Sequence, residues 1–190
     1  RKYLFKICIC AISPVITIFQ IESVLSQTSD EFKKAWEYAH YEEQDCKRAF
    51  YFINQAIKVQ PKDWKAYIYR SRTLRELCND KIGAIADTNF LINDLLKNPL
   101  NKEDKDNLSV AYMSRAISIE LIADQNWKKM NNAPTEFETN MYRDKALTGF
   151  REAIADYSKA ITLDRKYVNA YYMRGDRKST RLNSSHRCIS

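Results

Sequence analysis

Small and aromatic residues recur at regular intervals between residues 27 and 175, within long runs of helix-forming residues. Only 3 glycines and 4 prolines occur among the 190 residues, which argues against a turn-rich β fold. A hydrophobic content of 45%, with 12% aromatic residues, is sufficient for a packed core. The sequence therefore predicts an all-α fold.

Several short stretches coincide when the sequence is compared with itself. The motif Ala-Tyr-x-x-Arg followed by a small residue occurs three times, as AYIYRS at 66–71, AYMSRA at 111–116 and AYYMRG at 170–175. AIADT at 84–88 matches AIADY at 153–157, and AIKVQPKDWKAYIYRS from Ala56 aligns without gaps on AITLDRKYVNAYYMRG from Ala160. Ala49 precedes Tyr67 by 18 residues, and Ala153 precedes Tyr171 by the same 18. These matched spacings predict a repeated helical unit.

The repeated stretches resemble the tetratricopeptide repeat family, in which a unit of about 34 residues forms two antiparallel helices, A and B. Ala49, Ala56 and Pro61 match the spacing of the family's B helix, and Ala153 and Ala160 match it again. Arg165 stands where that second unit would have its proline. The resemblance covers residues 30–175. It implies stacked helix hairpins in a right-handed solenoid, with about three and a half units in residues 27–175.

Insertions interrupt the repeat. Tyr67 and Tyr112 lie 45 residues apart, and Tyr112 and Tyr171 lie 59 apart, so the units exceed the family period by about 11 and 25 residues. The first excess falls mostly in NDLLKNPLNKEDKDN. The second lies between Tyr112 and Ala153, where we expect an elongated helix or a loop at 122–144. The first A helix, around Trp36, is expected to be about one turn short or shifted.

The resemblance assigns packing roles to the recurring residues. Small side chains let the two helices of a unit lie close together, and tyrosines fill the gaps between units. These packing residues are Tyr67, Ser71, Ala84, Tyr112, Ala116, Ala153, Ala160, Tyr171 and Gly175. The recurring arginine is either surface charge or one half of an ion pair across each hairpin. Such pairs would join Arg70 to Asp87 and Arg115 to Asp156.

In this family the A helices line a concave groove that takes an extended peptide or a partner helix. The register places ten residues in that groove: Lys65, Ile68, Tyr69, Arg72, Met113, Ser114, Ile117, Asn169, Tyr172 and Met173. Aromatic, Met and Arg side chains are enriched at interface centres, but the same residues would also suit packing against adjacent helices. The Lys/Asn/Arg clamp with which chaperone-binding members hold a terminal carboxylate is not matched, because Ile68, Tyr69 and Met173 occupy key positions.

Residues 1–26 resemble a secretory signal peptide, with a basic start, an apolar run from Ile7 to Phe19 and Ser26 two residues after Val24. We expect cleavage before Gln27 and a secreted or periplasmic, cell-envelope location. The alternative is an uncleaved N-terminal anchor, although an apolar run of 13 residues is short for a membrane span of about 20.

Residues 176–190 resemble, over DRKSTRLNSSH, a translated reading frame of a common short-read sequencing adapter. We therefore expect an artefactual, disordered tail rather than a basic arm. This tail and residues 1–26 contribute +3 and +2 to the formal net charge of +7, which leaves +2 for residues 27–175. The nearly neutral middle removes the charge argument for nucleic-acid binding.

The cysteines, histidines and glycines of the sequence form no recognisable catalytic or metal-binding motif. His40 and His186 cannot form a metal site with the scattered cysteines, and the sequence lacks a Gly-rich phosphate loop and a G-x-S-x-G turn. Cys46 and Cys78 are the two cysteines between the terminal segments. They could pair in an oxidising compartment, but we expect them to be buried thiols.

The sequence therefore predicts a non-enzymatic scaffold or adaptor that binds a protein or peptide partner. It predicts no cofactor, metal or nucleic acid, and a membrane contact only if the N-terminal segment is uncleaved. The alternative is the N-terminal repeat region of a larger multi-domain envelope protein, with a regulatory or catalytic domain beyond Gly175.

Overall fold

The computed structural model describes residues 29–97 and 100–177, and all regular structure in these ranges is helical. The helices are α2 (Ser29–Glu37), η1 (Tyr38–Glu42), α3 (Cys46–Val59), α4 (Trp64–Glu76), α5 (Lys81–Leu95), α6 (Lys102–Asn131), α7 (Glu136–Leu163) and α8 (Val168–Arg177). η1 is a π-helix that continues α2. The expected all-α class is confirmed for this part of the chain. The expected signal segment at 1–26 and the tail from residue 178 on lie outside the described residues.

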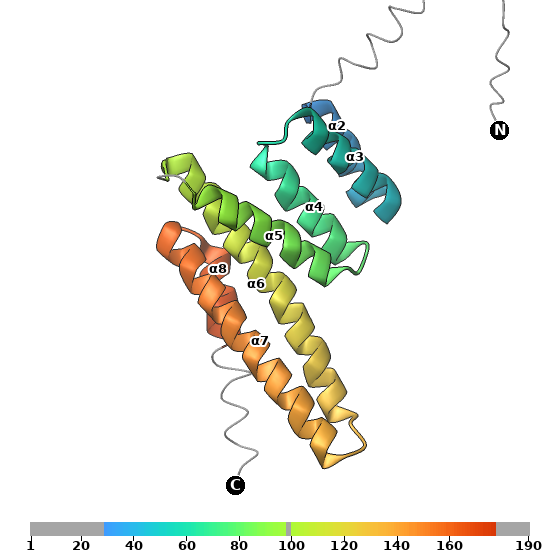
Figure 1. Ribbon diagram of the computed structural model, residues 1–190, viewed down its shortest axis with the longest axis vertical. Helices are drawn as coiled ribbons and strands as arrows, with labels where there is room; N and C mark the ends of the chain where they lie inside the picture. Colours follow the sequence, from blue (N-terminus) through green and yellow to red (C-terminus); the bar gives the residue numbers. More distant parts are fainter. Residues whose placement is uncertain (1–28, 98–99, 178–190) are drawn as a thin grey trace, which may run out of the picture.

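Side-chain caps mark where the helices begin. Asp45, Asp63 and Asp80 accept backbone N–H bonds at the starts of α3, α4 and α5. Asn101 forms a reciprocal capping box with Asp104 at the start of α6. Because only short connections separate the helices, consecutive helices run antiparallel as hairpins (Figure 1).

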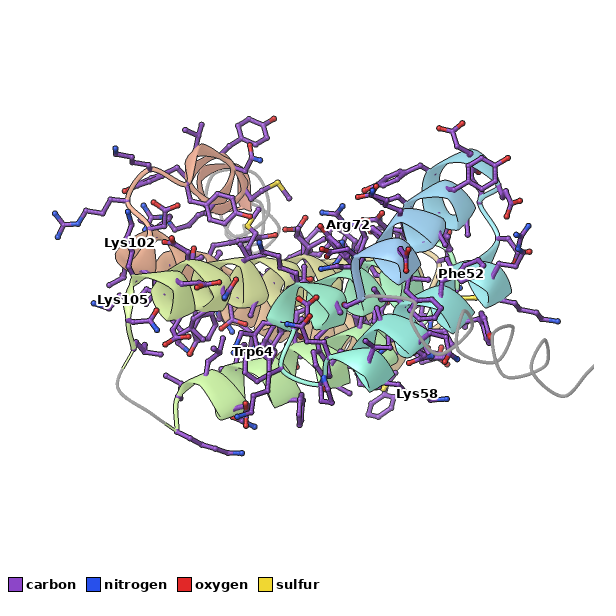
Figure 2. The ribbon with its side chains drawn as sticks, turned by 90° about the horizontal axis from the view of Figure 1, so that it is seen from above. Phe52, Lys58, Trp64, Arg72, Lys102 and Lys105 are labelled. Atoms are coloured by element: carbon purple, nitrogen blue, oxygen red, sulfur yellow. A yellow bond between two sulfur atoms is a disulfide. The ribbon has the colours of Figure 1, made fainter. Side chains whose placement is uncertain are left out.

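The helices form two curved layers. Each helix packs against the next along the chain, and α4 also contacts α6. In Figure 2, α2, α4, α6 and α8 follow the inner side of an arc, and α3 and α5 follow its outer side. We call the inner side, formed by α2/η1, α4, α6 and α8, the concave face. The helices that alternate with these along the chain, α3, α5 and α7, are the outer helices.

Small residues occupy the contacts between helices. The expected packing residues Ser71, Ala84, Ala116, Ala153 and Ala160 are fully buried. Ser71 Oγ donates to the carbonyl oxygen of Ala84 over 3.2 Å, which shows how closely α4 and α5 approach. Tyr67 and Tyr112 are also buried, in a core that includes Leu91 and Tyr157.

The last two expected packing residues are placed differently. Tyr171 is 42% exposed, and a Cβ added at Gly175 would meet no atom within 4 Å. The reason is that no helix follows α8 within the described residues. Nothing there requires a small residue at Gly175.

The extra residues between Tyr112 and Ala153 lengthen both helices of one hairpin. α6 has 30 residues and α7 has 28, and their joined ends project beyond α4 and α5 (Figure 1). Ala123, Ala146 and Phe150 form a separate small core in this projection, with Trp127 packed against it. An elongated helical hairpin, rather than a loop, therefore occupies most of 122–144.

Cys46 and Cys78 form a disulfide, which corrects the expectation of buried thiols. Cys46 is the first residue of α3, and Cys78 follows the end of α4. Their Cα atoms lie 5.2 Å apart, within the range that a disulfide spans. The bond ties the outer helix of the first hairpin to the inner helix of the second.

Gly149 lies at a close approach of α6 and α7. A Cβ at this position would lie 2.9 Å from the Cβ of Ala123. We expect Gly149→Ala to lower the free energy of unfolding by about 1–3 kcal/mol through overpacking, despite the better helix propensity of alanine. Urea titration measures the change. Gly175→Ala is the matched control, with open space at its Cβ, and stabilisation by both substitutions would contradict the close approach.

Candidate functional site

The concave face contains the residues expected to contact a partner. Arg72 lies between the helices on either side of this face, α2/η1 and α8 (Figure 2). Lys65 and Asn169 are exposed, and Tyr172 on α8 is 73% exposed. Ile68, Arg72, Ile117 and Met173 are half-buried, and the three apolar ones pack at the edge of the central core. These seven residues are accessible, in whole or in part, to a partner.

The other three expected groove residues serve packing. The Tyr69 ring stacks on Trp36, with ring centroids 4.3 Å apart and an angle of 5° between the planes. Met113 is buried in the central core. Ser114 is buried and lies within 3.2 Å of the Ser71 hydroxyl. Met113 and Ser114 are therefore closed to a partner on the concave face, whereas Tyr69 is half-buried and keeps part of its surface accessible.

Arg72 differs from its neighbours on α4 in having no carboxylate partner. Its Nη1 donates to the Tyr41 hydroxyl over 2.6 Å, and no ion pair found in the described residues includes it. Arg70 and Arg75, by contrast, are paired with Asp87 and Glu76. Arg72 thus presents a half-buried guanidinium whose charge is not neutralised by a direct carboxylate contact.

A polar network lies beneath the concave face and joins α2/η1, α4 and α6. Trp36 Nε1 donates to Thr73 Oγ1 over 2.7 Å. His40 Nε2 lies 3.3 Å from one Glu76 oxygen, and Arg75 Nη2 donates to the other over 2.8 Å. Arg75 Nη1 also donates to Ser114 Oγ over 3.1 Å. These bonds satisfy buried polar groups and fix the relative positions of three inner helices.

A hydroxyl and an imidazole meet in this network, since Thr73 Oγ1 lies 3.4 Å from His40 Nδ1. Thr73 is fully buried, and its hydroxyl donates to the Tyr69 carbonyl while accepting from Trp36. His40 is buried as well. These groups hold helices together and do not reach an open surface. The combination of His40, Thr73 and Arg75 does not recur in the other units, so the repeat pattern contains no signal for it.

The pairs expected across the hairpins are brought together on the outer side. Arg70 Nε and Nη2 donate to the two Asp87 oxygens over 2.8 and 2.6 Å. Arg115 donates in the same way to Asp156, over 2.7 and 2.8 Å. Hydrogen bonding to Asp156 raises the pKa of Arg115, because it favours the charged guanidinium.

Each of these arginines also contacts a third helix, a contact that was not predicted from the sequence. Arg70 Nη1 donates to Asn54 Oδ1 on α3, and Arg115 Nη1 donates to Asn89 Oδ1 on α5. One guanidinium therefore joins an inner helix to two successive outer helices. The two asparagines occupy corresponding positions, five residues after Ala49 and Ala84.

Three further features of the described residues concern metal, membrane and ligand sites. No group of three or more potential metal ligands occurs in the described ranges. No helix in the described part of the chain is both long enough and apolar enough to cross a membrane. A cavity of about 450 Å³ lies between α5, α6 and α7, where Ile85, Ile122 and Ala123 contribute to its lining.

Acidification is expected to destabilise the first hairpin through His40. Burial lowers the pKa of His40, although the contact with Glu76 opposes this effect. The unfolded chain therefore takes up a proton at higher pH than the folded one, and stability falls as pH drops below about 6.5. We expect His40→Gln to show a flatter dependence of the unfolding free energy between about pH 7 and pH 5. Equal slopes for the variant and the wild type would contradict this role.

No protein-family model, no curated protein and no solved structure matches the chain. The comparison that the molecule does offer is internal. Asn54–Arg70–Asp87 and Asn89–Arg115–Asp156 make the same contacts in successive hairpins, as expected of units that repeat.

Proposed function

We propose that this protein is a non-enzymatic scaffold of the tetratricopeptide type, which binds an extended peptide or a helix of a protein partner on its concave face. The observation that carries the proposal is the half-buried guanidinium of Arg72, which has no carboxylate partner and lies between the helices on either side of that face (Figure 2). Arginine and tyrosine are among the residues that contribute most to binding energy at protein interfaces.

Exposed tyrosines on the two helices that flank Arg72 support the same surface. Tyr41 on η1 is exposed and accepts a hydrogen bond from Arg72. Tyr172 is exposed on α8, the helix on the other side of the concave face. An aromatic ring with a polar hydroxyl offers a large contact area and a hydrogen bond at the same time. This combination suits a peptide better than a small polar ligand.

The solenoid interpretation draws support from how the helices alternate. Inner and outer helices follow one another along the chain, and each Asn–Arg–Asp bridge spans one inner and two outer helices. Stacked units of this kind form an extended concave surface with room for a linear partner.

We further propose that the protein works in an oxidising compartment outside the cytosol. The Cys46–Cys78 disulfide supports this, because disulfides persist in such compartments and are rare in the cytosol. The signal-like pattern of residues 1–26 agrees with it.

Peptide display against the full 190-residue chain tests the proposal. Selected peptides should lose affinity at least about tenfold in Arg72→Ala and in Tyr172→Ala. Phe137→Ala serves as the control, since Phe137 is also exposed but lies at the start of α7 in the projecting hairpin. Thermal unfolding of each variant shows whether the fold is kept.

Two results would contradict the proposal. One is the failure of display to select any peptide that binds the folded protein. The other is a set of peptides whose affinity does not change in the Arg72 and Tyr172 variants, which would place binding on another surface.

A further inference from the structure

The outer helices differ sharply in charge. α3 carries Lys47, Arg48 and Lys58 and no acidic residue, which gives it a formal charge of +3. α5 has one lysine against two aspartates, and α7 has four basic residues against five acidic ones. Positive charge on the outer side is therefore concentrated on α3.

A cleft of about 580 Å³ lies along this helix. Lys47, Phe50, Tyr51, Asn54 and Lys58 of α3 contribute to its lining together with Arg70 of α4. Phe50 and Tyr51 are exposed. At the floor Arg70 is held by Asn54 and neutralised by Asp87, so the free positive charge belongs to the lysines at the rim.

Lys47 and Lys58 take part in none of the ion pairs found in the described residues, whereas Arg48 is paired with Glu43. Both lysines are exposed. They lie 11 residues apart, which is three helical turns, so both project from one side of α3 about 16 Å apart. One unpaired ammonium group thus lies at each end of a row of side chains that also contains Phe50 and Tyr51.

The corresponding cleft between α5 and α7 lacks these rim residues, which shows that helix packing does not require them. It has the same floor, in which Arg115 contacts Asn89 and Asp156. When Ala49 is aligned on Ala84, the positions of Lys47, Phe50, Tyr51 and Lys58 are occupied in α5 by Ile82, Ile85, Ala86 and Asn93. The α5–α7 cleft is also lined by Glu152 and by a lysine, Lys159, but this lysine is paired with Asp156. Of the two clefts, only the one along α3 combines two unpaired lysines with aromatic residues.

We propose that the surface formed by Lys47, Phe50, Tyr51, Asn54 and Lys58, the α3 surface, is a second docking site, and that its ligand is an acidic peptide segment with aromatic residues. Carboxylates of such a segment complement the two lysines, and its aromatic side chains pack on Phe50 and Tyr51. The Asn54 amide, oriented by Arg70, lies between the lysines along α3. This site lies on the outer side and does not depend on the function proposed for the concave face.

The number of free charges favours a peptide over a nucleic acid. Proteins that bind the DNA backbone commonly neutralise about 6–10 phosphates with Lys and Arg side chains. The α3 surface offers two unpaired lysines. Two lysines suffice to orient a short acidic segment whose remaining contacts are aromatic and polar.

Isothermal titration calorimetry of the full chain with a poly(Glu,Tyr) copolymer at low salt tests this site. We expect the double charge reversal K47E/K58E to weaken binding at least about tenfold, and Tyr51→Ala to weaken it several-fold. The matched control is K102E/K105E, which makes the same change in net charge. Lys102 and Lys105 are exposed and lie at the far end of the molecule from Phe52 and Lys58 (Figure 2).

Each other outcome overturns the proposal. Absence of binding would show that the α3 surface does not recognise acidic peptides, and equal losses in K47E/K58E and K102E/K105E would show a non-specific charge effect. Tighter binding of single-stranded DNA that depends on Lys47 and Lys58 would assign the surface to nucleic acid. Loss of copolymer binding in Arg72→Ala, with K47E/K58E unchanged, would move the site to the concave face. Thermal unfolding confirms that each variant is folded.

Discussion

Replacing Cys46 and Cys78 together by serine is expected to lower the free energy of unfolding by about 3–4 kcal/mol. The disulfide links residues 32 apart in sequence and so restricts the unfolded chain more than a short loop would. It also ties α3 to the end of α4. In the double variant, the amides of the first hairpin, α2/η1 and α3, should therefore be the first to lose protection against hydrogen exchange. Guanidinium titration of the oxidised wild type and of C46S/C78S measures the difference.

Reductant provides the control for this prediction. Adding a dithiol should shift the wild type toward the stability of C46S/C78S and should leave the double variant unchanged. Equal stability of the double variant and the oxidised wild type would show that the disulfide contributes nothing to the fold.

Asp156→Ala is expected to destabilise the protein by about 3 kcal/mol or more, because it leaves the Arg115 guanidinium without its carboxylate. The side chains of Arg115 and Asp156 are only 19% and 5% exposed, so water replaces the lost partner poorly. The Arg115 guanidinium also holds Asn89, so the contact between α5 and α6 should loosen as well. Urea titration measures the effect.

An exposed pair on the same outer side gives the comparison. Lys97 and Asp94 lie 2.9 Å apart, but their side chains are 67% and 29% exposed. We expect Asp94→Ala to change the free energy of unfolding by no more than about 1 kcal/mol. If Asp156→Ala and Asp94→Ala cost the same, the Arg115–Asp156 pair is not the link between hairpins described above.

Features that recur in the sequence were predictable. Small residues such as Ser71 and Ala116 and the AIAD stretches set the alignment of one hairpin on the next. That alignment placed Arg70 opposite Asp87 and Arg115 opposite Asp156, where the structure joins them. Repetition helps because a contact that serves one unit must be met by the same residue types in the next.

Features that occur once were not predictable in the same way. Cys46 and Cys78 are unique to the first two hairpins, and nothing in their spacing distinguishes a disulfide from two buried thiols. His40 contacts Thr73 and Glu76 because the π-helix η1 brings it over α4. Such long-range contacts depend on helix packing that a linear pattern does not specify.

The predicted groove residues show that the sequence pattern did not predict the exposure of individual side chains. The register placed Tyr69, Met113 and Ser114 on the inner side, but it could not show how far neighbouring helices cover them. Trp36 stacks on one face of the half-buried Tyr69, and the central core encloses Met113. Exposure therefore had to come from the structure, and it leaves Arg72 and Tyr172 as the most informative positions.

Hydrogen–deuterium exchange of the full chain, with and without a display-selected peptide, tests the central claim most directly. Binding on the concave face predicts slower exchange in the segments that span α4 and α8, with the tip of the α6–α7 hairpin unchanged. Protection confined to that tip or to the outer helices α5 and α7, or no protection at all, would contradict the assignment of this face as the protein-binding surface.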